Sequence, residues 1–410
     1  MTDRPRSIGL VGGGLAAAKA AETLRAGGYD GGLWLLGEEV HHPYDRPPLS
    51  KQLLTGSADP STVELQQATF YTDHDIELIT DDAAVALDRQ TSTVTTRTGR
   101  QLGFDRLLLA TGATPRQLPV TDQDLEGIVT LRTLDDALSL RRRLENAGHV
   151  AVVGAGWIGC EVAAAARQHD AAVTLIDPLA TPLQRVVGAE VGQVFAELHR
   201  EHGVELRLGV SVSDVGGTDR VEQLRLSDET ALDVDLVVVG IGVSPRTELA
   251  ESAGLVVDDG IVADQWLACD DPRVFVAGDV ANAWHPHYGH HVRVEHWANA
   301  LHQGETAALN MVGGRVPYAR LPYFFSDQYE LGLEYVGMAA ATDEVVFRGD
   351  PSTREFIAFW LRAGRVTAAM NVNVWDVVDE LTAIVAGPPV DLGQLTDPDV
   401  GLSDLAARAA

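Results

Sequence analysis

The chain contains very few cysteines and lacks long hydrophobic runs. Of its 410 residues only two are cysteines, Cys160 and Cys269, and their spacing fits neither a disulfide framework nor a zinc site. No stretch approaches the ~18 consecutive uncharged apolar residues of a membrane-spanning helix. Residues 1–25 also lack an apolar segment that ends in a cleavage site. These absences predict a soluble, cytoplasmic protein without a metal site.

Positive charge is scarce as well. The chain has 59 acidic and 31 basic residues, a formal net charge of -28, and only two lysines, Lys19 and Lys51. Because nucleic acids and anionic membranes are bound through Lys and Arg, this balance argues against both as partners. At ~150 residues per domain, the length predicts two or three domains.

A glycine-rich motif near the start predicts a dinucleotide-binding unit. The apolar residues 8–11 lead into Gly12-Gly13-Gly14-Leu15-Ala16-Ala17, a G-x-G-x-x-A pattern that opens an Ala-rich helix over 16–26. A second apolar strand, 33–36, is followed by Glu38 and Glu39. In this Rossmann fingerprint the first glycine makes the turn, the second admits a pyrophosphate, and the small third residue lets helix and strand pack closely. The helix N-terminus attracts the phosphates, and the acid can bind a ribose.

The whole unit recurs later in the chain. Strand 150–153 runs into Gly154-Ala155-Gly156-Trp157-Ile158-Gly159, followed by a predicted helix over 160–169 and a strand over 172–176 that ends at Asp177. Two fingerprints predict two dinucleotides, and the natural pairing is a flavin with a nicotinamide. Asp177 should accept from the adenosine ribose 2′-OH and repel a 2′-phosphate, and residues 178–184 contain no basic side chain. NAD is therefore favoured over NADP.

Strands that end in glycine turns suggest how the domains are connected. Such strands precede Gly112 and Gly240 and bracket the second fingerprint, and a further strand at 274–280 continues the first domain. The second dinucleotide-binding domain therefore looks inserted into the first. Toward the end of the chain, residues 331–336, 355–361 and 366–371 read as strands, and 376–384 as a helix that 387–389 would end.

Several further motifs carry a family resemblance over nearly the whole length. The chain resembles ferredoxin reductases of the putidaredoxin-reductase and rubredoxin-reductase type, and is also similar to apoptosis-inducing factor. Besides the two fingerprints, the resemblance rests on residues 43–51 (Pro-Tyr-Asp-Arg-Pro-Pro-Leu-Ser-Lys), 110–112, 276–280, 295–300 and 326–329. It implies an α/β, glutathione-reductase-like flavoprotein with two dinucleotide-binding domains and an α+β C-terminal domain. These would be a discontinuous FAD-binding domain (1–115 and 246–322), an inserted NAD-binding domain (116–245) and the C-terminal domain (323–410).

The resemblance also implies the residues that contact each cofactor. Those implied for FAD are Gly12, Gly13, Gly14 and Leu15 at the pyrophosphate, Glu38 and Glu39 at the ribose, Ala84 at the adenine, Arg46 at the phosphates or the adenine edge, Asp279 at the ribityl chain, and Lys51, His296, Trp297 and Phe325 at the flavin ring, with Ala17, Arg116 and Glu295 as further FAD residues. Those implied for NAD are Gly154, Gly156, Trp157, Ile158, Gly159, Glu161, Asp177 and Gly242. Phe325 departs from the family, which usually has Trp at this position, so the flavin environment is expected to differ.

The two cysteines are too far apart in sequence to form the paired motif of disulfide reductases, so electrons must leave the flavin for an external acceptor. The predicted activity is that of an NADH-dependent ferredoxin reductase. Hydride would pass from NADH to FAD, and single electrons would pass to a 2Fe-2S ferredoxin that supplies a monooxygenase or ring-hydroxylating dioxygenase. Lys51 and Glu161 are the predicted catalytic pair, the alternatives being a solvated lysine and a water-facing glutamate. Alternative functions are a rubredoxin reductase, an NADH oxidase, or an interaction protein like apoptosis-inducing factor.

The charge bears on the ferredoxin partner. Small ferredoxins are usually acidic, and two acidic proteins repel each other, so docking would need a local basic patch. Candidates for the patch are Arg293, Arg315, Arg320, Arg362 and Arg365. The alternative is that these are scattered surface arginines. The histidines of residues 285–291 are expected in a polar surface loop beside the acceptor site rather than around a metal.

Overall fold

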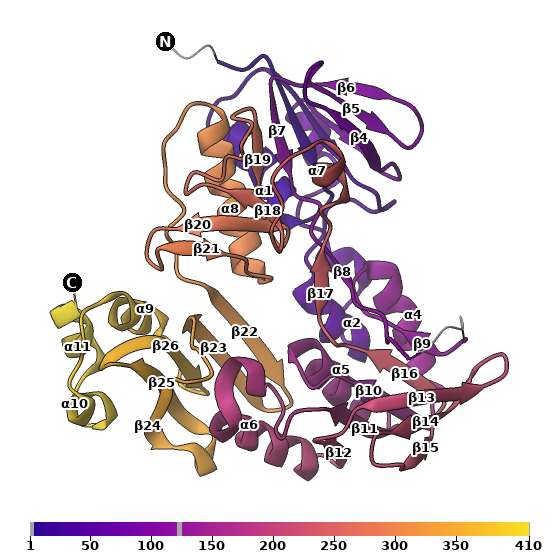
Figure 1. The fold of residues 1–410 in the computed structure, drawn as a ribbon, viewed down its shortest axis with the longest axis vertical. Helices are drawn as coiled ribbons and strands as arrows, with labels where there is room; N and C mark the ends of the chain where they lie inside the picture. The colour runs from indigo at the N-terminus through magenta and orange to yellow at the C-terminus, as the bar shows by residue number, and fades with distance from the viewer. Residues whose placement is uncertain (1–3, 121–124, 410) are drawn as a thin grey trace. The chain divides into compact units, whose positions relative to one another are not determined.

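The computed structural model describes residues 4–120 and 125–409 (Figure 1). The chain divides into two compact units: unit 1 comprises Met1–Asp45, Ser61–Thr114 and Ser244–Pro322, and unit 2 comprises Arg46–Pro60, Pro115–Val243 and Tyr323–Ala410. Strands β8 (Ala113–Pro115) and β17 (Val243–Pro245) carry the chain from one unit to the other. Among the helices of the described residues, none has the length and hydrophobicity needed to cross a membrane. The three predicted domains run over residues 1–3, 121–124 and 410, which lie outside this description.

Unit 1 is built on a parallel sheet in the order β19-β7-β1-β2-β3. Its strands are β1 (Ser7–Val11), β2 (Gly32–Leu36), β3 (Ile76–Ile79), β7 (Arg106–Leu109) and β19 (Val274–Val276). Ile8, Leu10 and Leu108 have no exposed surface, as expected for a sheet covered on both faces. The predicted strands 8–11 and 33–36 are thus confirmed as neighbours in this sheet.

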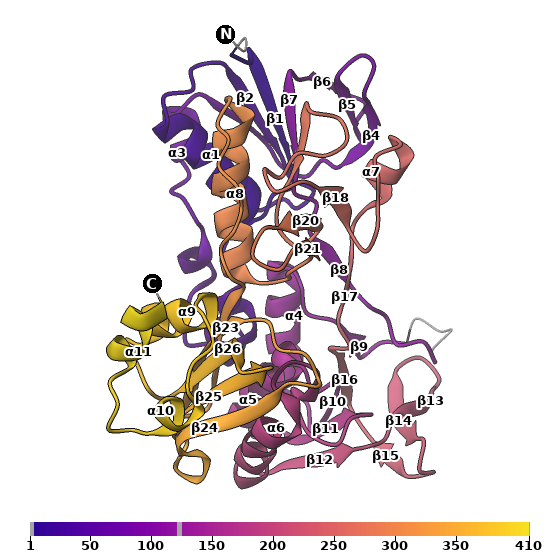
Figure 2. The ribbon, with the colours of Figure 1, turned by 60° about the vertical axis from the view of Figure 1, so that its left-hand side comes forward.

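Two long helices, α1 (Leu15–Ala26) and α8 (Trp297–Met311), lie side by side in unit 1 (Figure 1; Figure 2). They approach closely because both present small residues: a Cβ added to Gly304 would lie 2.3 Å from the carbonyl oxygen of Ala16. The remaining elements of unit 1 are α3 (Phe70–Asp73), β4 (Ala84–Asp88), β5 (Thr93–Thr96), β6 (Gln101–Gly103), α7 (Glu248–Ser252), β18 (Ile261–Ala263), β20 (Ala281–His285) and β21 (His290–Val292).

The expected polar surface loop over residues 285–291 is instead a β-hairpin. His287, His290 and His291 are exposed as predicted, but the loop conformation and the exposure of His285 were predicted wrongly. Strands β20 and β21 pair antiparallel across a turn in which Gly289 has a φ of 68°. Along β20, Ala281, Asn282, Ala283 and His285 are all buried, whereas Trp284 is 40% exposed. His285 is 3% exposed and is therefore an interior residue.

Unit 2 contains a second parallel sheet, in the order β12-β11-β10-β16-β9. Its strands are β9 (Ile128–Val129), β10 (His149–Val153), β11 (Ala172–Asp177), β12 (Val204–Leu208) and β16 (Leu236–Val239), with helices α4 (Leu134–Leu144), α5 (Trp157–Gln168) and α6 (Gln184–Glu201). An antiparallel sheet is formed by β13 (Val212–Gly217), β14 (Val221–Leu226) and β15 (Ala231–Asp233). The predicted second fingerprint is confirmed as a strand-turn-helix-strand unit, with the helix beginning three residues earlier than expected.

The C-terminal part of unit 2 is an antiparallel sheet in the order β22-β23-β26-β25-β24. It comprises β22 (Tyr323–Gln328), β23 (Leu331–Gly337), β24 (Glu344–Asp350), β25 (Glu355–Arg362) and β26 (Arg365–Val372), followed by α9 (Val378–Ala386), α10 (Leu392–Thr396) and α11 (Leu402–Ala409). The three predicted strands are confirmed. Helix α9 begins at Val378 rather than at Asp376, because Asp376 has a φ of 61°, which a right-handed helix cannot include. The short elements η1 (Pro47–Ser50) and α2 (Gln52–Thr55) also belong to unit 2.

Candidate cofactor-binding and active site

The first glycine turn leaves open space at the start of α1. Gly12 has a φ of 126° and donates to the carbonyl of Leu36, and an added Cβ there would lie 2.1 Å from the Ala110 oxygen. Gly14 precedes the helix in an extended conformation with no side-chain cap, and an added Cβ would meet nothing within 4 Å. Gly12 is therefore required by the turn, whereas Gly14 borders open space beside backbone N–H groups that an anion can bind.

The acids after β2 and the start of β4 lie at the same edge of unit 1. Glu38 pairs with Arg246 at 2.6 Å, and Glu39 accepts a hydrogen bond from the Tyr44 hydroxyl at 2.6 Å. The backbone N–H of Asp82 donates to Gly37, two residues before Ala84 begins β4. The predicted ribose and adenine residues are thus brought together, and Arg246 adds a cation that the sequence reasoning did not assign.

The turn after β19 places Asp279 beside the starts of α1 and α8. Gly278 has a φ of 81°, and its added Cβ would lie 3.4 Å from the Ala16 Cβ and 3.8 Å from the Ala300 Cβ. The side-chain oxygen of Gln303 accepts from the Gly278 N–H at 2.9 Å and holds this turn. An acid at such a strand end suits a polyol such as the ribityl chain.

The predicted flavin-ring residues of unit 1 lie at the N-terminus of α8. His296 precedes the first helical residue, Trp297, whose indole N–H donates to the Asp45 carboxylate at 2.5 Å. Glu295 forms an ion pair with Arg293. Trp297 is therefore tied to the segment 43–51 that the sequence reasoning singled out.

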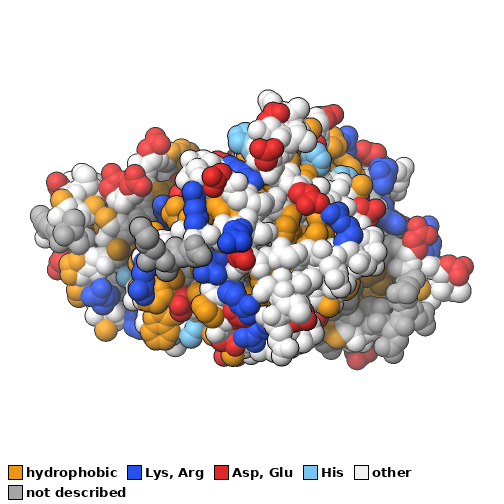
Figure 3. All heavy atoms as spheres, turned by 90° about the horizontal axis from the view of Figure 1, so that it is seen from above, with side chains coloured by type: hydrophobic (Ala, Val, Ile, Leu, Met, Phe, Trp, Pro, Cys, Tyr) orange, Lys and Arg blue, Asp and Glu red, His pale blue; other side chains and the backbone are white. Residues whose placement is uncertain are grey.

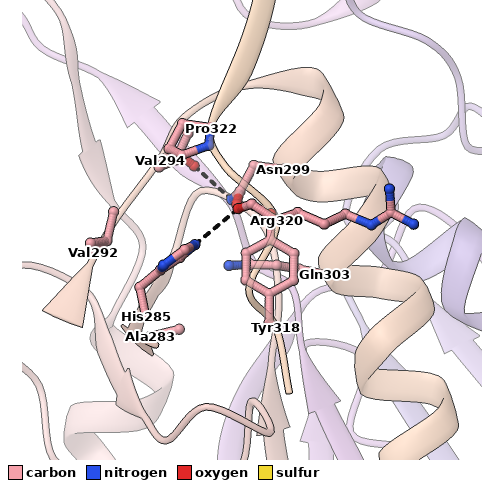
Figure 4. Close-up of a pocket in the computed structure, with 9 residues that line it drawn as sticks. All are labelled: Ala283, His285, Val292, Val294, Asn299, Gln303, Tyr318, Arg320 and Pro322. Carbon is pink, nitrogen blue, oxygen red and sulfur yellow. Dashed lines mark hydrogen bonds between the residues drawn. The ribbon is translucent and has the colours of Figure 1, made fainter. Parts of the chain in front are cut away.

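A small cavity lies under α8 (Figure 4). His285 projects into it and donates through Nε2–H to the Arg320 carbonyl at 2.9 Å, while the Arg320 guanidinium points away from the cavity. Burial lowers the pKa of His285, so its imidazole is neutral at physiological pH. The cavity has room for about one water molecule and cannot hold a dinucleotide.

The second glycine turn in unit 2 repeats the geometry of the first. Gly154 has a φ of 103°, and an added Cβ would lie 2.3 Å from the Gly240 oxygen; on Gly159 it would lie 1.9 Å from the Gly154 oxygen. At Gly156 an added Cβ would meet nothing within 4 Å. Asp177 accepts from the N–H groups of Ala155 and Leu179, both at 2.8 Å. Its carboxylate is thereby fixed at the end of β11.

The other predicted cofactor residues of unit 2 have clear positions. Gly242 has a φ of 100° and accepts from the Arg116 backbone N–H at 2.9 Å, so Arg116, predicted for FAD, lies next to a residue predicted for NAD. Ile158 is 45% exposed at the start of α5, next to Trp157. Arg46 lies directly before η1.

Lys51 and Glu161 form a buried ion pair in unit 2. The two side chains are 12% and 4% exposed, and Lys51 Nζ lies 3.0 Å from Glu161 Oε1. Glu161 also accepts from the hydroxyls of Ser326, at 2.7 Å, and Ser50. The alternatives of a solvated lysine and a water-facing glutamate were therefore wrong. Lys51 Nζ lies 5.5 Å from the centre of the Phe325 ring, which brings that predicted residue to the same place.

Sequence reasoning missed Ser50 and Ser326 as members of this cluster. Both lie inside motifs that carried the resemblance, next to Lys51 and Phe325, and this adjacency was the available signal. Neither residue has a spacing that predicts contact with Glu161, because Ser326 is 165 residues away in sequence.

The two cysteines are not reactive groups. Both are free thiols, Cys160 buried and Cys269 half-buried, and burial is the largest cause that raises the pKa of each. A thiol with a raised pKa is a poor nucleophile at neutral pH. Among the described residues no group of three or more His, Cys, Asp or Glu could hold a metal ion.

Several arginines proposed for a basic patch already have partners. Arg293 pairs with Asp259 and Glu295, and Arg362 pairs with Asp343 at 2.7 Å. The guanidinium of Arg315 lies 4.8 Å from the centre of the Trp266 ring. Basic side chains gather near the middle of the face shown in Figure 3, with acidic side chains among and around them. The ion pairs neutralise the charge of Arg293 and Arg362 locally.

The residues present fit two dinucleotides, since each glycine turn leaves room at its second glycine and has an acid after the next strand.

In sequence, residues 6–304 match the family described as pyridine nucleotide-disulphide oxidoreductase, and residues 323–406 match the family described as reductase C-terminal. The chain is 38% identical over 403 residues to the 5,5'-dehydrodivanillate O-demethylase ferredoxin reductase subunit of Sphingobium sp. (strain NBRC 103272 / SYK-6), covering 97% of this chain and 98% of that one.

Other relatives agree with this result. The chain is 37% identical over 411 residues to putidaredoxin reductase CamA of Pseudomonas putida, covering 98% of this chain and 97% of the relative. The solved structure of a covalent putidaredoxin reductase-putidaredoxin complex superimposes with a TM-score of 0.95 at 36% identity, covering 98% of this chain and 99% of that one. The fold class and the resemblance inferred from the motifs are confirmed. The chain therefore belongs to the pyridine nucleotide-disulphide oxidoreductase family and carries its reductase C-terminal segment.

Proposed function

We propose that this protein is an FAD-dependent, NADH-dependent ferredoxin reductase that passes electrons to a small 2Fe-2S ferredoxin of an oxygenase system. The observation that carries the proposal is the combination of two dinucleotide-type glycine turns with two unreactive, unpaired cysteines. Without a redox disulfide, electrons from the nicotinamide must leave for a separate acceptor. The names of the relatives, which are reductase components of oxygenase systems and a putidaredoxin reductase, support the same acceptor class.

FAD, when bound, would accept a hydride from NADH and release electrons one at a time. The residues that would hold it in unit 1 are the turn Gly12–Leu15 and Ala17 for the pyrophosphate, Glu38, Glu39 and Ala84 for the adenosine, Asp279 for the ribityl chain, and Glu295–Trp297 for the ring. Arg46, Lys51, Arg116 and Phe325 belong to unit 2 and are proposed as FAD residues on the family resemblance. The chain's own contribution is to bind and orient, because hydride transfer needs positioning more than an acid or a base.

We assign to Lys51 the electrostatic stabilisation of the reduced flavin. Its ammonium group is ion-paired and 12% exposed, so its charge is poorly screened by water. A fixed cation beside the flavin ring stabilises negative charge that develops there on reduction. Glu161 holds this cation in place and would also contact the nicotinamide end of NADH.

NADH is the proposed reductant because Asp177 is fixed as a carboxylate at the end of β11. With Gly154, Gly156–Gly159 and Gly242 it would form the NAD site, and its negative charge would repel the 2′-phosphate of NADPH. The measurement is stopped-flow reduction with each nucleotide. Equal efficiency of NADPH and NADH would overturn the assignment.

The acceptor is tested by NADH-driven reduction of cytochrome c with and without a 2Fe-2S ferredoxin. We expect the ferredoxin to raise the rate severalfold. If it adds nothing and rubredoxin does, the protein is a rubredoxin reductase; if O2 consumption accounts for the NADH used, it is an NADH oxidase. An NADH-triggered change without turnover would instead indicate an interaction protein like apoptosis-inducing factor.

The proposed function carries two further proposals. We assign FAD binding to residues 1–115 and 246–322, NAD binding to 116–245, and the C-terminal domain to 323–410, because each glycine turn heads its own parallel sheet. We place the protein in the cytoplasm, where NADH is supplied.

A further inference from the structure

A chain of buried hydrogen bonds continues beyond the Lys51–Glu161 pair. Ser326, which donates to Glu161, lies 3.4 Å from Gln328 Nε2, and Gln328 Oε1 lies 3.0 Å from His199 Nε2. Ser326 is 1% exposed, and Gln328 and His199 are fully buried. The chain therefore connects α5, β22 and α6 within unit 2 and has no contact with water at these three residues.

The direction of each hydrogen bond follows from the donors and acceptors available. The Glu161 carboxylate only accepts, so Ser326 gives its single hydroxyl proton to it. The free lone pairs of Ser326 then accept from the Gln328 amide nitrogen, which turns the amide oxygen toward His199. That oxygen also only accepts, so His199 must carry its proton on Nε2. Burial lowers the pKa of His199 to about 4, so the imidazole is neutral. Its Nδ1 has no hydrogen-bond partner among the described residues.

All these donors point toward Glu161. Each donor polarises the next, and in a dry interior such aligned hydrogen bonds strengthen one another. Lys51, Ser50 and Ser326 hold the carboxylate in one orientation. A carboxylate without this support would be costly to bury and free to rotate, and Lys51 would lose its fixed partner.

We propose that Ser326, Gln328 and His199 are positioning residues for Glu161, and that through Glu161 and Lys51 they set the reduction potential of the flavin and the rate at which NADH reduces it. This inference rests on the proposed function, in which Lys51 acts on the flavin. None of the three residues touches a cofactor; each acts through the next hydrogen bond. A purely structural role would affect stability and leave the potential unchanged.

The experiment compares purified, FAD-loaded variants by stopped-flow reduction with NADH and by the midpoint potential of the flavin. Gln328→Met keeps the size of the side chain and removes both hydrogen bonds, and His199→Leu removes the last donor. We expect each to slow flavin reduction about fivefold, the value of roughly one buried hydrogen bond, and to make the potential more negative. His199→Gln, which restores a donor at the ε position, should recover most of the rate.

Matched variants separate positioning from packing. Asn371 lies in the same antiparallel sheet and is fully buried, and its amide nitrogen donates to Glu334 and to the Val374 carbonyl. Asn371→Met should therefore lower the stability of the protein without changing the midpoint potential of the flavin. In the double variant with Lys51→Met, Gln328→Met should have no further effect on the reduction rate. Should Gln328→Met fail to fold, Ser326→Ala also removes the hydrogen bond between Ser326 and Gln328, together with that between Ser326 and Glu161, and it changes the side chain less.

The results of these variants distinguish a failure of this inference from a failure of the proposed function. If Lys51→Met alters the potential while Gln328→Met, Ser326→Ala and His199→Leu do not, this inference is wrong and the proposed function stands. If Lys51→Met also leaves the potential and rate unchanged, the assigned role of Lys51 is wrong. Independently of FAD, ¹⁵N NMR of the histidine ring should show the Nε2–H tautomer for His199, and the Nδ1–H tautomer would overturn the chain.

Discussion

At the scale of single residues, the two lysines provide a test with a built-in control. Lys51→Met should slow reduction of the flavin by NADH at least about tenfold, because a poorly screened cation that stabilises developing charge is removed. The other lysine, Lys19, is in a surface pair with Glu22, so Lys19→Met should leave the rate unchanged. The measurement is stopped-flow reduction under anaerobic conditions. An unaltered rate in Lys51→Met would remove this residue from the mechanism.

Gly14 provides a second residue-scale prediction, in which binding and folding are separable. Gly14→Ala places a Cβ in open space, so the chain should fold, but the methyl group occupies room that the pyrophosphate needs. We expect FAD content to fall about tenfold or more on purification, with circular dichroism unchanged. Gly103→Ala, where an added Cβ also meets nothing within 4 Å, is the control and should retain FAD. Full FAD occupancy in Gly14→Ala would contradict the assignment of this turn.

At the scale of elements, α4 has a cap whose contribution can be measured. Thr133 accepts from the Asp136 N–H, and Asp136 accepts from the Thr133 N–H, which forms a capping box. Thr133→Ala should lower the free energy of unfolding by about 1 kcal/mol. Thr69 precedes α3 without a side-chain cap, so Thr69→Ala should change stability by much less. Chemical denaturation of both variants is the measurement, and equal losses would show that the box contributes nothing.

Elements built from local signals were predictable from the sequence, and those built from distant contacts were not. The turns at Gly12 and Gly154 are local, because a positive φ and a close backbone approach require glycine at these positions. The burial of His285 was not predictable, because a run of histidines reads as polar, whereas His285 ends β20 with 3% exposure beside the 40% exposed Trp284. The partners of Glu161 were missed for the same reason, since Ser326 reaches it only through packing of β22 near α5.

At the scale of the whole molecule, each unit contains a buried neutral histidine, His285 in unit 1 and His199 in unit 2. Burial lowers both pKa values below the ~6.5 of an unfolded chain, so the unfolded state binds more protons as the pH falls below ~6.5. The contribution of His199 to the free energy of unfolding is therefore fully present above pH ~6.5 and is lost as the pH falls toward its folded-state pKa of about 4; that of His285 is lost in the same direction. We expect the shifted pKa of His199 alone to lower the free energy of unfolding by about 2 kcal/mol between pH 7.5 and pH 5. Denaturation at several pH values should show a smaller slope for His285→Gln than for the exposed control His291→Gln.

Net charge sets the salt dependence of the reaction with the acceptor. The chain carries -28, and Arg293 and Arg362 are neutralised by acids, so an acidic ferredoxin is repelled at long range. Raising the ionic strength from about 0.01 to 0.15 M shortens the Debye length from about 30 to 8 Å and should lower the KM for ferredoxin severalfold. The KM for an uncharged quinone as the electron acceptor should not change with ionic strength. A KM that rises with salt would instead indicate a basic docking surface.

The amide of Gln328 has one more consequence for the buried chain. A carboxamide neither takes up nor gives up a proton at physiological pH, so it interrupts any path for protons between His199 and Glu161. The hydrogen bonds of this buried chain can polarise one another, but they provide no route for proton transfer between His199 and Glu161. A proton taken up at His199 therefore has no hydrogen-bonded route to the ion pair of Glu161 with Lys51.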